Sequence, residues 1–198
     1  MRIVGGKFRG RALKSPASNA IRPTSDRLRE SVFNILVHAY GNPIEGARVL
    51  DLFAGTGALG LEALSRGAHY TLFVEEAAEA RALIRENIES LALTGATKIF
   101  RRDAATLGDM GPIAAFDLVF CDPPYGRGLA ERSLASASAG KWLAPAALVV
   151  VEDTVKPGFK TPEGFEELER RDYGDTEVIF LRAKRSAAAE QFLDVGKR

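Results

Sequence analysis

The stretch Asp51-Leu-Phe-Ala-Gly-Thr-Gly-Ala-Leu-Gly60 decides the interpretation of the fold, because its glycines follow a Gly-x-Gly-x-x-Gly pattern. The pattern lies where an apolar run, residues 49–53, gives way to helical spacing over residues 57–66. Glycines at such a position allow a tight turn and let a ligand approach the backbone beside the positive end of the helix. The pattern alone is weak, since dinucleotide-binding proteins and plain α/β proteins share it. It nevertheless indicates a candidate cofactor-binding turn.

Strand and helix patterns alternate along the rest of the chain. Five apolar runs and a C-terminal pair joined by Tyr173-Gly174-Asp175 predict seven strands, at residues 49–53, 70–75, 98–102, 116–121, 147–152, 165–171 and 177–182. The helical spacing falls at residues 57–66, 77–93 and within 129–142. Strands this apolar, separated by helices, indicate a parallel sheet covered on both faces, and the last pair indicates an antiparallel hairpin at one edge. The α/β pattern resembles the class I S-adenosylmethionine-dependent methyltransferase fold, which is Rossmann-like, with a mostly parallel seven-stranded sheet and an antiparallel C-terminal strand.

Acidic residues at the predicted strand ends distinguish between cofactors. Asp51 precedes the first glycine by four residues, where an anion would repel a pyrophosphate and attract an ammonium group. Glu75, with Glu76 as the alternative, ends the second strand, where a carboxylate can accept both ribose hydroxyls. Asp103 and Ala104 follow the third strand and are candidates for reading the adenine edge. Together these features favour S-adenosylmethionine over a nicotinamide cofactor. The expected cofactor-binding residues are Asp51, Phe53, Ala54, Gly55, Thr56, Gly57, Glu75, Glu76, Asp103 and Ala104.

The sequence Asp122-Pro123-Pro124-Tyr125 directly follows the fourth predicted strand and supplies the candidate catalytic residues. Two prolines fix φ and remove two backbone donors, so the turn is stiff and its carbonyls are free to accept. The Asp122 carboxylate and the Pro123 carbonyl can hold the protons of an exocyclic amine and aim its lone pair at a sulfonium methyl group. Tyr125 can stack on the base that carries the amine. The loop therefore indicates methylation of an amino group.

Composition and charge set the context of this site. The 198 residues, 46% hydrophobic and 27% charged, suit one globular domain. The net charge of +1 is uneven, because residues 1–30 contain eight Lys or Arg against two acids, or +6. This basic end includes a predicted hairpin, turned at Gly5-Gly6, and leads to a helix that begins after Thr24 or Ser25 and ends near Tyr40. The basic end is consistent either with a phosphate-binding extension or with chance clustering.

Other classes of protein fit the sequence poorly. The single cysteine, Cys121, favours a reducing compartment, and no apolar stretch approaches the roughly 18–20 residues of a membrane span. We therefore expect a cytoplasmic protein that does not associate with membranes. His38 and His69 have no ligand partner at useful spacing, so no metal site is expected.

At the level of whole motifs the chain closely resembles the RsmD family of bacterial methyltransferases, which methylate the N2 amine of a guanine in small-subunit ribosomal RNA. The block over residues 22–34, Arg-Pro-Thr-Ser-Asp-Arg-Leu-Arg-Glu-Ser-Val-Phe-Asn, is the most specific of the shared motifs. The other shared motifs lie at residues 2–11, 51–62, 117–125 and 173–175. Cys121, where an aliphatic residue is usual, and the tail over residues 186–198 depart from the family pattern.

The resemblance implies the substrate and the residues that contact it. Arg22, Thr24 and Arg27 would border the cofactor and substrate cleft, and the basic hairpin, with Arg9 and Arg11, would grip RNA. The partner would be small-subunit ribosomal RNA or its assembling particle, and the protein is expected to be a monomer. We divide the chain into a basic extension (residues 1–23), a methyltransferase domain (24–185) and a tail (186–198).

Three alternatives remain open from the sequence. Asp-Pro-Pro-Tyr does not name the base, so adenine N6 or cytosine N4 of DNA or RNA could be the methylated amine. A non-catalytic RNA-binding assembly factor could retain the same fold. A nicotinamide oxidoreductase is the least favoured, because no hydride-transfer acid or base is recognisable.

Overall fold

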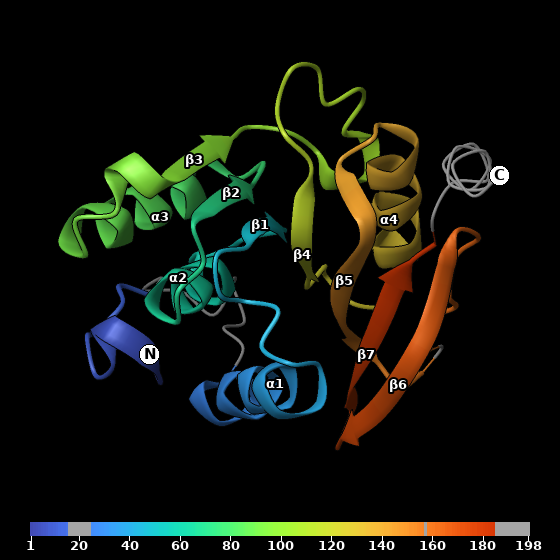
Figure 1. The fold of residues 1–198 in the computed structure, drawn as a ribbon, viewed down its shortest axis with the longest axis horizontal. Coiled ribbons are helices and arrows are strands. Elements are labelled where there is room, and N and C mark those ends of the chain that lie inside the picture. Colours follow the sequence, from blue (N-terminus) through green and yellow to red (C-terminus); the bar gives the residue numbers. More distant parts are fainter. Residues whose placement is uncertain (16–24, 157, 185–198) are drawn as a thin grey trace, which may run out of the picture.

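A computed structural model describes residues 1–15, 25–156 and 158–184. Its seven-stranded sheet has the order β3-β2-β1-β4-β5-β7-β6, from left to right in Figure 1. The strands are β1 (Arg48–Leu52), β2 (Tyr70–Val74), β3 (Thr97–Phe100), β4 (Phe116–Cys121), β5 (Leu143–Thr154), β6 (Phe165–Tyr173) and β7 (Thr176–Ala183). The α-helices are α1 (Asp26–Ala39), α2 (Ala58–Ser65), α3 (Ala78–Ser90) and α4 (Leu129–Ala139), and single 3-10 turns are η1 (Gly6–Phe8), η2 (Thr94–Ala96) and η3 (Ala104–Thr106).

The strand directions confirm the predicted fold class. Strands β3, β2, β1, β4 and β5 pair in parallel, whereas β7 runs antiparallel to both β5 and β6. The strand order reverses between β1 and β4, because β2 lies on one side of β1 and β4 on the other. In open α/β sheets a crevice for ligands forms outside the carboxyl ends of the strands at such a reversal. The glycine turn after β1 and the loop after β4 flank this point.

Helices cover both faces of the sheet. Val32, Phe33 and Leu36 of α1 pack in one cluster with Leu118 and Phe120 of β4. Successive strand residues point to opposite faces. The intervening residues of β4 accordingly pack with α4, in a cluster that contains Val119, Cys121, Ala130, Leu134 and Ala137. Helices α2 and α3 pack around Phe73 of β2 through Leu61, Ile84 and Ile88.

Several element ends differ from the sequence prediction for local backbone reasons. Strand β1 ends at Leu52, because Phe53 has φ +58 and leaves the extended region. Strand β5 begins at Leu143 instead of residue 147, with Ala146 at φ +63 beside the register shift between Phe116 and Leu118 of β4. Helix α1 begins after Ser25, whose side chain accepts a hydrogen bond from the Leu28 amide, as one of the two predicted caps.

The N-terminal segment, residues 1–14, folds back on itself and packs onto α2. An isolated antiparallel bridge joins Arg2 and Ala12, and the 3-10 turn η1 reverses the chain between them. The predicted turn at Gly5-Gly6 is only partly right, since Gly6 has φ +72 but Gly5 is extended at φ −147. Gly5 instead allows close approach, because a Cβ there would lie 2.3 Å from the Arg66 guanidinium.

Candidate active site

The predicted site residues follow the carboxyl ends of neighbouring strands. Leu52, the last residue of β1, is in register with Val74 of β2 and Cys121 of β4. The residues just beyond these positions therefore share one edge of the sheet. Along this edge the order is Asp103 after β3, Glu75 after β2, the glycine turn after β1 and Asp122 after β4. An elongated cofactor lying across β3, β2 and β1 would point one end toward the loop after β4.

Asp51 is a buried carboxyl group beneath the glycine turn. Its side chain is 2% exposed, and Oδ2 accepts a hydrogen bond from the Gly60 amide at 2.9 Å. Burial raises the pKa of Asp51 to about 8, opposed by the Gly60 hydrogen bond and assisted by the negative charge of Glu75. Among the described residues no Lys, Arg or His forms an ion pair with Asp51. A carboxyl group in this state fits a ligand that brings an ammonium group.

Glu75 connects the glycine turn to the end of β2. Its Oε2 accepts from the Gly55 amide at 2.9 Å, and its Oε1 accepts from the Ala77 amide at 2.7 Å. An ionised carboxylate has about four lone-pair sites, so two remain to accept ribose hydroxyls. Glu76 is exposed, and its carbonyl accepts from the Arg81 guanidinium. Glu75 is thus the better placed of the two predicted candidates.

Asp103 and Ala104 start the 3-10 turn η3 after β3. Asp103 Oδ1 accepts from the Ala105 amide at 2.8 Å, and Oδ2 accepts from the Thr106 hydroxyl at 3.3 Å. Ala104, the first residue of this turn, is buried. The capping bonds orient the Asp103 carboxylate at the edge of the sheet, and each oxygen keeps a lone pair for a ligand.

The loop after β4 has one buried and one exposed proline. Asp122 and Tyr125 are half-buried, Pro123 is buried and Pro124 is exposed. The Tyr125 hydroxyl donates to Glu152 Oε1 at 2.8 Å. Burial, followed by the negative charge of Glu152, raises the pKa of Tyr125 well above its ordinary value, so the phenol stays protonated at neutral pH. Glu152, on β5, therefore holds the Tyr125 ring in place through this hydrogen bond.

Glu152 was not among the residues predicted from the sequence. It lies one position beyond Val151, the β5 partner of Cys121, and its side chain is 9% exposed. A signal was available, because a carboxylate that ends an apolar run is the same pattern that identified Asp51 and Glu75. Its hydrogen bond to Tyr125, 27 residues away, was not inferable from local sequence.

Asn87 of α3 is a second residue that sequence reasoning missed. Its side chain is 1% exposed and donates from Nδ2 to the Thr56 carbonyl at 3.1 Å and to the Lys14 carbonyl at 3.2 Å. Its Oδ1 accepts from the Lys14 amide at 2.7 Å. The glycine turn and the N-terminal segment are therefore held by the same buried amide.

The predicted RNA-contacting arginines have different surroundings. Arg9 is exposed on the N-terminal segment, whereas the Arg11 guanidinium donates to the Ser90 carbonyl at the end of α3 at 2.8 Å. Arg27 is exposed on the first turn of α1. Arg22 and Thr24 lie outside the described residues, as do the loop over residues 16–24 and the predicted tail.

The described parts of the chain also bear on metals and membranes. Within residues 1–15, 25–156 and 158–184, no three His, Cys, Asp or Glu side chains are grouped so that they could hold a metal ion. In the same residues no helix combines the length and the apolar character that crossing a bilayer requires.

A parallel sheet whose order reverses at β1 and β4, with β7 running against its neighbours, is the fold of class I S-adenosylmethionine-dependent methyltransferases, and the strand-end carboxylates suit that cofactor. The magnesium protoporphyrin IX methyltransferase of Synechocystis PCC 6803, solved with S-adenosylmethionine bound, shares the fold at a TM-score of 0.59 and 19% identity, over 80% of this chain and 79% of that one. The fold class and the cofactor predicted from the sequence are confirmed.

More similar proteins identify the family. Residues 1–182 match the family described as "Conserved hypothetical protein 95". "Ribosomal RNA small subunit methyltransferase D" of Escherichia coli strain K12 is 38% identical over 195 residues, 98% of this chain and 94% of that protein. A solved structure, "Putative methyltransferase yhhF from Escherichia coli", has a TM-score of 0.79 and 32% identity, over 94% of this chain and 99% of that one. The chain belongs to this family, the RsmD family whose motifs the sequence resembles.

Proposed function

We propose that the protein transfers a methyl group from S-adenosylmethionine to the exocyclic N2 amine of a guanine in small-subunit ribosomal RNA. One observation supports the chemistry above all others, which is that the Asp-Pro-Pro-Tyr loop and the glycine turn end adjacent strands, β4 and β1. The name of the Escherichia coli relative, at 38% identity over nearly the whole chain, supports ribosomal RNA as the substrate.

The chain's own residues would bind and orient both reactants. S-adenosylmethionine, when bound, supplies a methyl group on a positively charged sulfur. Asp51 would stabilise the ammonium group, Glu75 would accept the ribose hydroxyls, and Asp103 with Ala104 would contact the adenine. Phe53, Ala54, Gly55, Thr56 and Gly57 would provide the backbone of the turn over which the cofactor lies, with Glu76 at its border.

The loop after β4 would prepare the amine. The Asp122 carboxylate and the Pro123 carbonyl accept the two amine protons, which favours a tetrahedral nitrogen with its lone pair directed at the methyl carbon. The new nitrogen–carbon bond forms as the carbon–sulfur bond breaks, and the nitrogen then loses one proton to Asp122 or to solvent. Pro124 keeps the turn stiff, and Tyr125, held by Glu152, stacks on the base.

Methyl transfer from labelled S-adenosylmethionine tests this function directly. Small-subunit RNA and assembling small-subunit particles serve as alternative substrates, and mass analysis of the nucleosides identifies the product. We expect N2-methylguanosine as the product. Methylated adenosine or cytidine would instead show that adenine N6 or cytosine N4 is the methylated amine. Absence of any affinity for S-adenosylhomocysteine in calorimetry would instead favour a non-catalytic assembly factor.

The catalytic assignment needs its own variant. Asp122→Ala should abolish turnover and leave the affinity for S-adenosylhomocysteine largely intact, because Asp122 faces the amine in this proposal. Asp109→Ala, at an exposed loop position, is the matched control and should retain full turnover. Normal turnover in Asp122→Ala would overturn the role of Asp122. We further propose that the protein acts as a monomer in the cytoplasm.

A further inference from the structure

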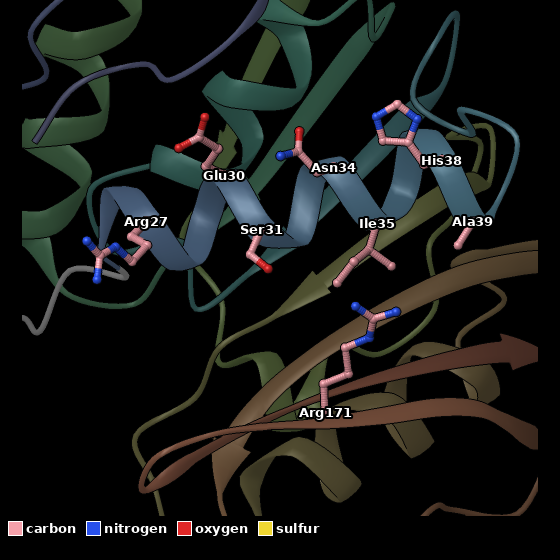
Figure 2. A pocket seen from close by; sticks show the side chains of 8 residues that line it. All are labelled: Arg27, Glu30, Ser31, Asn34, Ile35, His38, Ala39 and Arg171. Atoms are coloured by element: carbon pink, nitrogen blue, oxygen red, sulfur yellow. The ribbon is translucent and has the colours of Figure 1, made fainter.

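A shallow cleft lies between α1 and β6. It has a volume of about 560 Å³ and is lined by Arg27, Glu30, Ser31, Asn34, Ile35, His38, Ala39 and Arg171. Figure 2 shows Ser31 and Ile35 pointing from α1 toward β6, with the Arg171 side chain extending from β6 toward the helix. Only Ile35 is buried, so the cleft is open along its length. An open cleft of this kind suits an extended chain better than a small molecule, which proteins usually enclose.

Two hydrogen bonds connect the helix and the strand across this cleft. The Ser31 and Tyr173 hydroxyls lie 2.8 Å apart, and Tyr40 donates to Glu169 at 3.2 Å. Because Tyr40, which caps the C-terminus of α1, lies nine residues beyond Ser31, these contacts are about 13 Å apart along the helix. Between them the cleft contains Ile35 on one side and Arg171 on the other.

The cleft begins near the catalytic loop. Tyr173 ends β6 and is paired with Thr176 at the start of β7. The Thr176 side chain forms a hydrogen bond with the Tyr125 side chain, which also contacts Glu152. One chain of contacts thus runs from Tyr125 through Thr176 and Tyr173 to Ser31. A strand of nucleic acid with one base at Tyr125 could continue directly into the cleft.

The lining has the chemistry of a phosphate-backbone site. Arg27 of α1 and Arg171 of β6 contribute two guanidinium groups to the lining against one carboxylate, Glu30, and the planar guanidinium group matches phosphate bidentately. Glu169 accepts from Arg171 at 2.6 Å, but a guanidinium has five N–H donors, so several remain. Ser31 and Asn34 add uncharged polar groups. The small apolar area, Ile35 and Ala39, disfavours an apolar partner helix.

We infer that the α1–β6 cleft binds the RNA strand adjacent to the methylated nucleotide, with Arg27 and Arg171 contacting its phosphates. This inference rests on the proposed RNA substrate and adds where that RNA lies. The twelve-residue spacing from Arg27 to Ala39 corresponds to about 18 Å of helix. A stacked strand, with phosphates about 3.4 Å apart along its axis, would place about five nucleotides there.

Kinetics of arginine variants provide the first test. Arg27→Ala and Arg171→Ala should each raise the KM for RNA about fivefold to tenfold. Each should also lower the slope of log affinity against log salt concentration by about one, as expected for the loss of one phosphate contact. The affinity for S-adenosylhomocysteine and the melting temperature should stay unchanged. Arg132→Ala, on the exposed side of α4 across the sheet, is the matched control. If KM and salt dependence match those of this control, the inference is overturned.

Photo-crosslinking provides a second test that is independent of turnover. The sole cysteine, Cys121, is 1% exposed, so a thiol-reactive crosslinker attached to Asn34→Cys would label the cleft alone. Irradiation of the complex with small-subunit particles should crosslink RNA within about five nucleotides of the modified base, whereas Arg132→Cys should not. Crosslinks confined to a ribosomal protein would overturn the RNA assignment. Failure of methyl transfer by the unmodified enzyme would instead contradict the proposed function.

Discussion

The side-chain amide of Asn87 donates a hydrogen bond to the carbonyl of Thr56 in the glycine turn, at 3.1 Å. The same side chain also binds the amide and the carbonyl of Lys14, 73 residues away. The cofactor turn is thus supported from behind by α3 and by the N-terminal segment, whose Ile3 and Leu13 are buried in the same cluster as Ala54 and Ala58. The basic end of the chain therefore contributes to the scaffold of the cofactor site.

Replacement of Asn87 should weaken both the fold and the cofactor site. Asn87→Ala leaves the buried Thr56 carbonyl and the part-buried amide and carbonyl of Lys14 without this partner, so we expect a loss of about 1–3 kcal/mol in the free energy of unfolding. The affinity for S-adenosylhomocysteine should fall several-fold, because the turn loses its support. Urea unfolding and calorimetry measure the two effects. Lys14→Ala is the control, since it removes only the exposed ion pair with Glu86 and keeps the backbone bonds.

Glu152 should affect turnover through Tyr125. Glu152→Ala removes the acceptor that holds the Tyr125 hydroxyl, so kcat should fall roughly tenfold while the KM for S-adenosylmethionine changes little. Glu152→Gln retains an oxygen acceptor and should restore most of kcat. Steady-state kinetics of both variants check this prediction. Equal losses in the two variants would show that the negative charge, and not the positioning of Tyr125, is what matters.

The raised pKa of Asp51 predicts that both the stability of the protein and its cofactor binding depend on pH. Folding raises its pKa from 3.8 to about 8, so between these values the native state binds more protons than the unfolded state. The Asp51 contribution to stability is therefore greatest at low pH and is lost as the pH rises toward 8. A ligand ammonium group favours the ionised carboxylate, so binding of S-adenosylhomocysteine near pH 7 should release a proton.

Calorimetry in buffers of different ionisation enthalpy measures this proton release. Asp51→Asn should abolish it and flatten the dependence of the melting temperature on pH between about 4 and 8. Proton release that persists unchanged in Asp51→Asn would assign the titration to another group.

Gly60 should not tolerate a side chain. A Cβ at this position would lie 2.5 Å from the Phe73 ring and 3.0 Å from Asp51 Oδ2. Gly60→Ala should therefore cost about 1–3 kcal/mol of stability through overpacking and should disturb the Asp51 carboxyl group. Gly95→Ala is the control, because a Cβ there meets nothing within 4 Å. Denaturant unfolding of both variants distinguishes a local clash from the general effect of adding a methyl group.

Features encoded locally were predictable from the sequence. Each strand that ends at the site is a short apolar run, and Asp51, Glu75 and Asp122 stand at the ends of such runs, so their common edge followed from the parallel sheet. Strand β5 was predicted too short, because its first residue, Leu143, pairs with Phe116 of β4 ahead of a register shift that no local pattern marks. The role of Gly5 was missed because it depends on the distance to Arg66 of a different element.

By itself the sequence determined the α/β class, the position of the site residues at strand ends and the family, because periodicity and spacing are local properties. Only the tertiary structure decided which side chains support the site residues. Asn87 reaches Thr56 across 31 residues, Glu152 reaches Tyr125 across 27, and Ser31 reaches Tyr173 across 142. Such contacts arise when separate elements pack against one sheet, and no local pattern specifies which buried polar groups then become partners.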